Sequence, residues 1–411
     1  MSSLTYCILI KGHGRRGDIR QVRHAYRKVQ NLDVDLATFN AILDAYARNG
    51  FLRAAEEMLC EMQQRGVTPS PRSYNTLLKG YARDGKLRPA FNVVRRMRDH
   101  LGPTAPNQVT YSTLVHACVG QGEFGRARQI LQWMAQEDSQ LGPDVWAYTA
   151  LMRGLLSPTS TRPALAAYDR ASARAAPSAT AAPAETVGGA TMVSRPGALQ
   201  EAVDLLREML LLDVQPNEVT TTTLLTACFD SGNVTVARGI ASLLRERAEA
   251  TSDGRLTHAA DSAMVVGFCR PGGGQATRDR SYLREALALF VKMTEAAEGD
   301  AALQPGARTC NALLAALVAS GEITSAARVL AAMDAGVAAA ADAYSLCIMM
   351  RGYGARRKLR EVEGLWQRML DGGLVDVVVL NTYLKACALS GDVPRALQAT
   401  NATPFLPLSR A

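Results

Sequence analysis

The stretch Tyr74–Leu78, YNTLL, decides the fold because similar stretches recur at nearly constant spacing along the chain. FNAIL at Phe39–Leu43 begins 35 residues earlier, and YSTLV at Tyr111–Val115 and YTALM at Tyr148–Met152 follow at steps of 37 residues. Behind each of the first three stands a Gly, then an Ala five residues on, and then a Met seven residues further. Agreement in both order and spacing predicts a repeat architecture.

Each repeat contains two stretches with the apolar spacing of an amphipathic helix. Tyr74–Tyr81 carries apolar residues at i, i+3, i+4 and i+7, and Ala90–Met97 carries them at the same offsets. Gly85, between the two stretches, suits a tight turn because a positive φ costs Gly little. A helical hairpin with two apolar stripes cannot bury both alone, so neighbouring hairpins must stack. The sequence therefore predicts an all-α solenoid of helix-turn-helix repeats.

The segment Val109–Asp144, which reads VTYSTLV…G…A…M…PD, resembles the pattern VTYNTLI…G…A…M…PD of the pentatricopeptide-repeat family. The resemblance covers nearly the whole chain and implies a right-handed superhelical α-solenoid of about ten repeats. Some repeats are degenerate, since Thr221 and Leu346 replace the aromatic residue and Arg357 replaces the turn Gly. The expected repeats begin at about Ser3, Leu36, Pro71, Gln108, Val145, Glu218, His258, Ala307, Ala343 and Val377.

Two segments interrupt the array. Residues 157–197 are rich in Ala, Pro, Ser and Thr without helical periodicity, which predicts a disordered insertion within one repeat, and the pattern of a second helix resumes after it. A shorter Gly-rich segment, residues 271–280, has the same character. The expected organisation is thus about four and a half basic repeats in residues 1–156, the insertion, further repeats in residues 198–400, and a short tail, residues 401–411.

The charge of the chain is positive and uneven. The formal net charge is +8, and residues 1–144 hold 20 Lys and Arg against 13 Asp and Glu. A basic half favours polyanions such as nucleic acid or a membrane surface, although this magnitude also occurs in proteins that bind neither. No apolar run approaches the roughly 20 residues that cross a bilayer, so no membrane partner is expected.

The eight Cys residues form no CxxC pair and no Cys/His cluster with the spacing of metal ligands, so no metal site is expected. Cys118, Cys228 and Cys387 recur at one repeat position, as small buried residues do. The sequence therefore predicts reduced thiols in the core.

One row of polar residues runs along the first helix of a repeat, opposite its apolar stripe. Arg72, Asn75, Lys79 and Arg83 follow one another at spacings of three, four and four residues, which places them on one helix face. Such a row is also the ordinary solvated face of an amphipathic helix, where Lys and Glu are expected. Short hydrogen-bonding side chains prevail at the Asn75 position, which favours a surface that recognises the bases of RNA. The residues there are Cys7, Asn40, Asn75, Ser112, Thr149, Thr222, Ser262, Asn311, Cys347 and Asn381.

The Asn75 position is the fifth residue of a repeat counted from Pro71. In the pentatricopeptide-repeat family, the fifth and the last residue of a repeat hydrogen-bond one base of single-stranded RNA, and the N-terminus of the protein lies toward the 5′ end of the RNA. The resemblance therefore implies that single-stranded RNA is the partner of this chain. It implies pyrimidines for Asn40/Ser70 and Asn75/Asn107, G for Ser112/Asp144, A for Thr149/Asn217 and U for Asn311/Asp342. The other expected last residues are Asp35, Thr257, Gly306 and Asp376.

The second residue of each repeat wedges between successive bases in this family, and flat side chains stack on bases for about 1 to 3 kcal/mol each. The resemblance implies this role for Arg72, Trp146, Arg308 and Tyr344. Trp146 fits packing between repeats equally well. Cations further along the first helix are expected to contact phosphates. They are Lys11, Arg15, Arg48, Lys79, Arg83 and Arg270, with His116, Arg153, Arg351 and Lys385 in other repeats.

A tetratricopeptide-type protein-binding scaffold is the alternative, because its 34-residue unit is also a helical hairpin. The W-x₂-L-G-x₂-Y order of that family is absent, whereas the Pro-Asp or Pro-Asn ending is present. An enzyme is not expected, since no His-x-Glu with CxxC is present and Gly272–Gly274 lacks the Lys-Ser/Thr of a P-loop. Neither a cofactor nor a small-molecule substrate is expected.

The resemblance implies a setting in the chloroplast or the mitochondrion, where such proteins act in transcript stabilisation, processing, splicing or translation. No Arg- and Ser-rich leader is visible ahead of the first repeat, so we expect either a mature form or a late start of the sequence. Any chemical step on the RNA is expected from a separate nuclease, splicing factor or translation factor.

Overall fold

The computed structural model of the chain contains nineteen α-helices and no strand in the part of the chain that it describes. The described residues are 3–30, 34–102, 104–137, 142–157, 197–251, 254–270, 280–297, 300, 303–390, 392 and 394–396.

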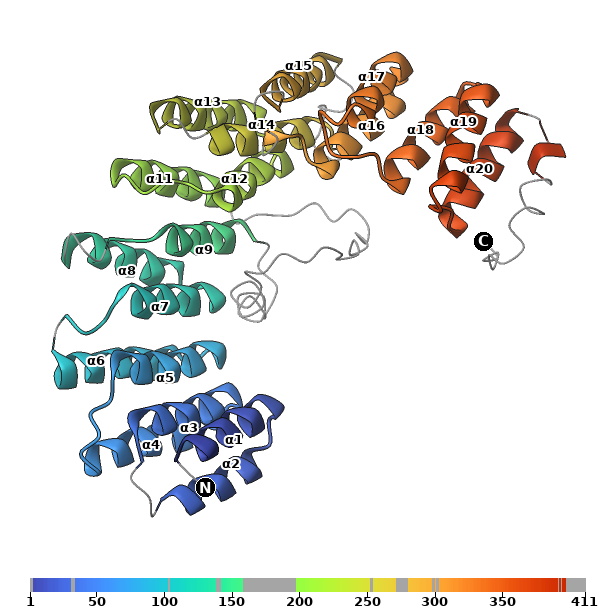
Figure 1. Ribbon diagram of the computed structural model, residues 1–411. Helices are drawn as coiled ribbons and strands as arrows, with labels where there is room; N and C mark the ends of the chain where they lie inside the picture. Colours follow the sequence, from blue (N-terminus) through green and yellow to red (C-terminus); the bar gives the residue numbers. More distant parts are fainter. Residues whose placement is uncertain are drawn as a thin grey trace. The chain divides into compact units, whose positions relative to one another are not determined.

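The helices group into two compact units of helical hairpins (Figure 1). The first unit takes in the described residues up to Gln215, and the second begins at Pro216. The helices of the first unit are α1 (Ser3–Arg16), α2 (Ile19–Val29), α3 (Leu36–Arg48), α4 (Leu52–Gln64), α5 (Pro71–Arg83), α6 (Leu87–Leu101), α7 (Gln108–Gly120), α8 (Phe124–Glu137), α9 (Val145–Leu156) and α11 (Ala198–Leu211). Those of the second unit are α12 (Glu218–Asp230), α13 (Val234–Thr251), α14 (Gly254–Phe268), α15 (Arg280–Ala297), α16 (Ala307–Ser320), α17 (Ile323–Asp334), α18 (Ala343–Ala355), α19 (Leu359–Asp371) and α20 (Val377–Ser390).

Within each unit the first helices of successive repeats pack on one another, and each also packs on the second helix of its own repeat. This series is α1, α3, α5, α7 and α9 in the first unit, and α12, α14, α16, α18 and α20 in the second. The two predicted apolar stripes are buried, since Tyr74, Leu77 and Leu78 of α5 and Ala90 and Met97 of α6 are at most 1% exposed. Neighbouring hairpins thus bury the apolar surface that a single hairpin would expose to water, which confirms the all-α solenoid.

Most first helices begin where a polar side chain caps them. Asp35 accepts a hydrogen bond from the Thr38 backbone N–H at 2.9 Å, and Ser70, Asn107 and Asp144 cap α5, α7 and α9 in the same way. A cap of this kind contributes about 1 kcal/mol. The polar residue that follows Pro at the end of these repeats is therefore the N-cap of the next helix.

A positive φ at the fifteenth residue of the repeat makes the turn between its two helices. Gly50, Gly85 and Gly122 have φ angles of 79°, 70° and 74°. Arg357 holds the same place in its degenerate repeat and adopts a φ of 57°. The turn thus persists where the Gly is lost, at a cost of about 1 kcal/mol.

The first helices begin at the predicted residues with one exception. α14 begins at Gly254 rather than at His258, because the buried Leu256 extends its apolar stripe by one turn. Thr257, which we expected to be the last residue of the preceding repeat, therefore lies inside the helix rather than at its N-cap.

Glycine contacts fix the register of α14 nonetheless. A Cβ added at Gly154 would lie 2.2 Å from Val119, and one added at Gly267 would lie 2.0 Å from Phe229. Gly154 is the tenth residue of its repeat and Val119 is the twelfth residue of the preceding one. Gly267 and Phe229 hold these same places when the repeat is counted from His258. The predicted register is therefore right, and the helix is extended at its N-terminal end.

The hairpin that the long insertion interrupts is closed, because α9 packs on α11. The Tyr148 hydroxyl of α9 donates to Glu208 of α11 at 3.3 Å. This pairing agrees with a second helix that resumes after residue 197. Residues 158–196 of the insertion lie outside the described residues, as do residues 271–279 of the Gly-rich segment and the end of the chain, 397–411.

All eight Cys residues are free thiols, and seven of them are buried, which confirms the predicted core thiols. Burial raises the pKa of Cys118 and Cys310 to about 11 and that of Cys228 and Cys269 to about 12. Cys60 is the exposed one.

Candidate nucleic-acid interface

Two predicted base-reading pairs of the first unit lie within hydrogen-bond distance. Asn75 Nδ2 donates to Asn107 Oδ1 at 3.2 Å. Ser112 Oγ lies 3.2 and 3.1 Å from the two carboxylate oxygens of Asp144. Asn75 and Ser112 are only 7% exposed, so these polar side chains are held by hydrogen bonds rather than by water. The fifth and the last residue of each of these repeats therefore form one polar edge.

The second unit contains one pair of the same kind. Asn311 Nδ2 lies 3.4 and 3.3 Å from the two carboxylate oxygens of Asp342. Asp342 also caps α18, since its Oδ1 accepts from the Ser345 backbone N–H at 2.7 Å. The carboxylate thus lies at the positive end of the α18 dipole.

The last residues of the pairs have a structural role that sequence reasoning missed. Asn107 Oδ1 accepts from the Thr110 backbone N–H at 3.1 Å, and Asp144 Oδ1 accepts from the Ala147 backbone N–H at 2.8 Å. Because the cap uses the oxygen of Asn107, its Nδ2 group remains available as a donor. The signal was present, since Asn or Asp directly before a helical stripe predicts an N-cap.

A second group of site residues was not predicted. The third residue of the next repeat carries a buried hydroxyl, which donates to the amide oxygen of the fifth residue. The signal for it is the Ser or Thr that stands two residues before the fifth residue in seven of the ten repeats. The oxygen–oxygen distances are 2.6 Å for Ser73 and Asn40, 2.7 Å for Thr110 and Asn75, and 2.5 Å for Ser345 and Asn311.

Asn40 and Ser70 are linked indirectly. Ser73 connects them, because its Oγ lies 3.1 Å from Ser70 Oγ and also donates to Asn40. The hydroxyl of Thr149 donates to a backbone carbonyl of its own helix at 2.6 Å. Thr149 lies in the first unit and Asn217 in the second, so their pairing stays a prediction.

Cys7 and Cys347, at the fifth place of two repeats, are buried and have no amide to present to a base. Their expected partners Asp35 and Asp376 cap α3 and α20. A hydrogen bond from the Thr38 side chain lowers the pKa of Asp35 below its usual range. These two repeats supply a carboxylate but no complementary donor.

Three further repeats lack a complete pair among the described residues. The Thr222 hydroxyl donates to the Glu218 carbonyl at 2.8 Å. The repeat of Ser262 ends in Gly306, which has no side chain. Asn381 is exposed, and the end of its repeat lies outside the described residues.

Two grooves follow the first helices of the first unit and bring cations beside the reading residues. The first has a volume of about 740 Å³, and the polar residues that line it include Lys11, Arg15, Asn40, Arg48, Ser70 and Arg72. The second has a volume of about 570 Å³, and its lining includes Asn75, Lys79, Arg83 and Asn107.

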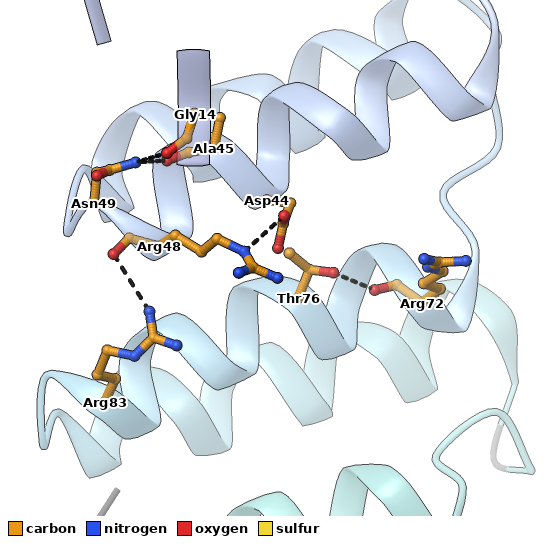
Figure 2. A network of polar contacts seen from close by, with 8 residues as sticks. All are labelled: Gly14, Asp44, Ala45, Arg48, Asn49, Arg72, Thr76 and Arg83. Carbon is orange, nitrogen blue, oxygen red and sulfur yellow. Dashed lines mark hydrogen bonds and ion pairs between the residues drawn. The ribbon is translucent and has the colours of Figure 1, made fainter. Parts of the chain in front are cut away.

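Two of the cations in these grooves, Arg48 and Arg83, make polar contacts with other groups of the protein (Figure 2). Arg48 Nε pairs with Asp44 Oδ2 at 2.7 Å, and Arg83 donates to the Arg48 carbonyl at 3.3 Å. Asn49 ties α3 to α1 by donating to the Gly14 carbonyl at 2.9 Å. The side chains of Arg48 and Asp44 are 54% and 45% exposed. Such a pair contributes only about 0.5 kcal/mol, so a phosphate can replace the carboxylate.

Two of the expected cations, Arg270 and His116, lie in surroundings that weaken their predicted role. Arg270 forms an ion pair with Asp230, the residue at the same place of the preceding repeat. The two side chains are 37% and 32% exposed, less than those of Arg48 and Asp44, so we expect Asp230 to neutralise Arg270 more fully. Burial lowers the pKa of His116 below its usual 6.5, although the Asp144 carboxylate opposes this shift. The imidazole is therefore neutral at pH 7 and is not a cation of the groove.

The predicted stacking residues stand exposed at the second place of their repeats. Trp146 is 53% exposed and Tyr344 is 60% exposed, and Arg72 and Arg308 are exposed as well. The half-exposed indole of Trp146 does not favour packing between repeats. These four flat side chains, each three residues before the fifth residue of its repeat, are therefore open to a ligand.

The second unit places a buried carboxylate where the first unit has an aromatic ring. Asp261, the fourth residue of its repeat, is 2% exposed and pairs with Arg245 at 2.5 Å. Tyr111 holds this place in α7, and its hydroxyl accepts from Arg98 at 3.0 Å. An Arg of the preceding second helix thus contacts the fourth residue in both units.

In the described ranges, no helix is both long and apolar enough to span a membrane. The same ranges contain no group of three or more His, Cys, Asp or Glu side chains that could hold a metal ion.

Solved structures similar to this chain include two of the pentatricopeptide repeat protein PPR10. The complex with an 18-nt psaJ RNA element is 20% identical with a TM-score of 0.45, and the match covers 98% of this chain and 59% of that one. PPR10 from maize is 17% identical with a TM-score of 0.31 and coverages of 98% and 64%. Yeast Rmd9p in complex with a 16-nt target RNA is 9% identical with a TM-score of 0.41 and coverages of 98% and 91%. The chain spans 59% of the PPR10 chain in the RNA complex.

A search of curated protein sequences found no significant match. Family profiles match in both units. The PPR repeat family matches residues 34–83 and 69–119, the pentatricopeptide repeat domain matches residues 204–248, and the PPR repeat matches residues 344–374. Together with the recurring helical hairpins, these matches show that the chain belongs to the pentatricopeptide-repeat family.

Proposed function

We propose that the chain binds single-stranded RNA in a sequence-selective manner, with one nucleotide per repeat. Family membership supports the proposal, and the first helices carry the three kinds of group that it requires. The paired fifth and last residues read base edges, exposed second residues stack on bases, and cations contact phosphates. No chemical step on the RNA is assigned to this chain.

The observation that carries the proposal is the set of paired reading residues. Asn75 with Asn107 and Ser112 with Asp144 each combine a donor and an acceptor on one edge. A solvated helix face would instead carry long charged side chains with high exposure. The groove beside Asn75 also contains cations, so one ligand can satisfy the base edge and the phosphate sites together.

The setting of the proposed function is a chloroplast or a mitochondrion, as the family resemblance implies. By occupying a stretch of RNA, the chain acts in transcript stabilisation, processing, splicing or translation. A separate nuclease, splicing factor or translation factor supplies any further step.

Selection of RNA ligands from a random single-stranded pool with the full chain tests this proposal. Three adjacent repeats predict the order pyrimidine, pyrimidine, G, read 5′ to 3′, for Asn40/Ser70, Asn75/Asn107 and Ser112/Asp144. An enriched motif that contains this order supports the proposal. The absence of saturable binding at low salt contradicts it and favours the protein-binding scaffold.

A further inference from the structure

The hydroxyl of Thr110 lies at a junction of hydrogen bonds inside the site. Its Oγ1 accepts from the Asn107 backbone N–H at 3.1 Å. It also lies 2.7 Å from Asn75 Oδ1 and 3.1 Å from Asn107 Oδ1. Thr110 is 0% exposed, so bulk water does not compete for these contacts.

A hydroxyl has one proton to donate, and the nearer acceptor here is Asn75 Oδ1. The amide of Asn75 is therefore held with its carbonyl toward Thr110 and its NH₂ toward Asn107. A flipped amide would place its oxygen against Asn107 Oδ1, which already serves as the acceptor of the cap. Two facing acceptors repel each other, so the observed orientation is the stable one.

The same arrangement recurs where the fifth residue is Asn and the next repeat is described. Ser112 differs, since the third residue of the next repeat is Ala147, which has no hydroxyl. The physical reason is that a Ser hydroxyl rotates to suit its partner, whereas an Asn amide has two ends of opposite character. The hydroxyl–amide pairs are Ser73/Asn40, Thr110/Asn75 and Ser345/Asn311.

We infer that Ser73, Thr110 and Ser345 are positioning residues that fix which end of the reading amide faces the RNA base. This inference rests on the proposed function. With the hydroxyl present, the amide offers N–H toward the groove and selects bases with an acceptor at that point. Without the hydroxyl, the amide can present either end, and discrimination between bases falls.

Substitutions at Thr110 in the full chain test the inference. Thr110→Val removes the hydroxyl and keeps the volume, whereas Thr110→Ser keeps the hydroxyl. Binding is measured to the selected RNA with each of the four bases at every position. We expect Thr110→Val to reduce discrimination about tenfold at the nucleotide of Asn75, the scale of one good base contact. Thr110→Ser should retain discrimination within about twofold.

Thr220→Val is the matched control, because Thr220 is the third residue of its repeat and contacts the cap Asn217 in the same way. The fifth residue of the preceding repeat is Thr149, which has no amide to orient. This variant therefore loses the same cap contact without a change in base profile. If Thr110→Val does not fold, Ser345→Ala, with Ser345→Thr as its conservative partner, provides the same comparison at Asn311.

A gain of discrimination is expected at the repeat that lacks the hydroxyl. Ser112→Asn places an amide beside Asp144, but Ala147 leaves it without a positioning group. Adding Ala147→Ser supplies that group. We expect the double variant to discriminate between bases at this nucleotide about tenfold better than Ser112→Asn alone. Equal discrimination by the two would contradict the inference.

The outcomes separate the inference from the function on which it rests. Absence of RNA binding by the unmodified chain overturns the proposed function. Selective binding with an unchanged profile in Thr110→Val overturns only the inference. Nuclear magnetic resonance of the full chain with ¹⁵N-labelled Asn gives a readout that needs no RNA. Slow rotation about the C–N bond keeps the two Asn75 amide protons at separate shifts in every variant. The orientation is therefore read from nuclear Overhauser contacts between these protons and Asn107, which we expect to weaken in Thr110→Val and to persist in Thr110→Ser.

Discussion

The repeat that begins at Pro71 in the first unit and the repeat that begins at His258 in the second unit have the same backbone plan and different surface chemistry. Tyr74 is buried in the first, whereas Asp261 is buried at the same place in the second and is neutralised by Arg245. Arg83 lines a groove of the first unit, whereas Arg270, its counterpart, pairs with Asp230.

This difference shows which positions the fold needs and which it leaves to function. The contacts that set the register join small residues to apolar side chains at the helix interfaces, such as Gly267 to Phe229. The fifth residue and the cations differ between the two units without loss of the solenoid, whereas the last residue also caps the helix that follows. The second unit therefore keeps the solenoid after its repeats have lost several of the groups that would bind RNA.

The largest effect is expected from the buried ion pair of the second unit. Arg245→Met leaves the Asp261 carboxylate buried without its guanidinium, and the free energy of unfolding should fall by about 3 kcal/mol. Urea denaturation followed by circular dichroism measures this change. Arg48→Met is the control, because its pair with Asp44 is half exposed and should contribute only about 0.5 kcal/mol. Equal losses of unfolding free energy in the two variants would contradict a larger contribution of the buried pair than of the exposed pair.

The next largest effect is expected in the salt dependence of RNA binding. If Arg48, Lys79 and Arg83 contact phosphates, the slope of log K against log salt should flatten by about 2 when all three become Ala, at about 0.7 per phosphate. Arg270→Ala should leave the slope unchanged, because Asp230 already neutralises Arg270. Filter binding at several salt concentrations measures both variants. An unchanged slope in a natively helical triple variant would show that the row is only solvated.

A substitution in the turn of the degenerate repeat should change stability by a smaller amount and in the opposite direction. Arg357→Gly removes the strain of a positive φ, and the free energy of unfolding should rise by about 1 kcal/mol. Gly50→Ala introduces that strain at a turn where a Cβ meets no atom within 4 Å, so stability should fall by a similar amount. Thermal unfolding of the two variants tests this pair of signs. A destabilised Arg357→Gly would mean that the Arg side chain itself holds the turn.

The smallest effect is a chemical one that leaves the fold intact. Under native conditions a thiol reagent should modify Cys60 alone at a fast rate, because it is the exposed Cys. Burial raises the pKa of Cys118 and Cys228 in the first and second unit, so their thiolates are scarce at neutral pH. Mass spectrometry of the labelled chain counts the modified thiols. Fast modification that persists in Cys60→Ser would show that one of the units opens.

Much of the fold could be predicted because the signals are local. The stripe, the turn Gly and the Pro-polar ending lie within one repeat, and they fix the starts of helices such as α5 and α7. The start of α14 was missed because Leu256 continues the stripe by one more turn. In a sequence, this extension is indistinguishable from the end of the preceding repeat.

The site could be predicted only in part, because its contacts cross repeats. The pair of Asn75 with Asn107 followed from the family pattern, and the hydroxyl of Thr110 did not. A Ser or Thr at that place has the signature of a helix N-terminus, and its second contact depends on the stacking of two hairpins. The ion pair of Arg270 with Asp230, 40 residues apart, was hidden for the same reason.

The most direct measurement of the central claim is the base preference of one repeat after its reading pair is replaced. Asn75→Ser with Asn107→Asp copies the Ser112/Asp144 pair into the preceding repeat and leaves the helices unchanged. Binding to RNAs with each base at each position should then show one nucleotide whose preference moves from a pyrimidine to G. The change should correspond to about 1 to 3 kcal/mol, with neighbouring nucleotides unaffected. An unchanged profile, or a change spread over two neighbouring nucleotides, would contradict recognition of one base by one repeat.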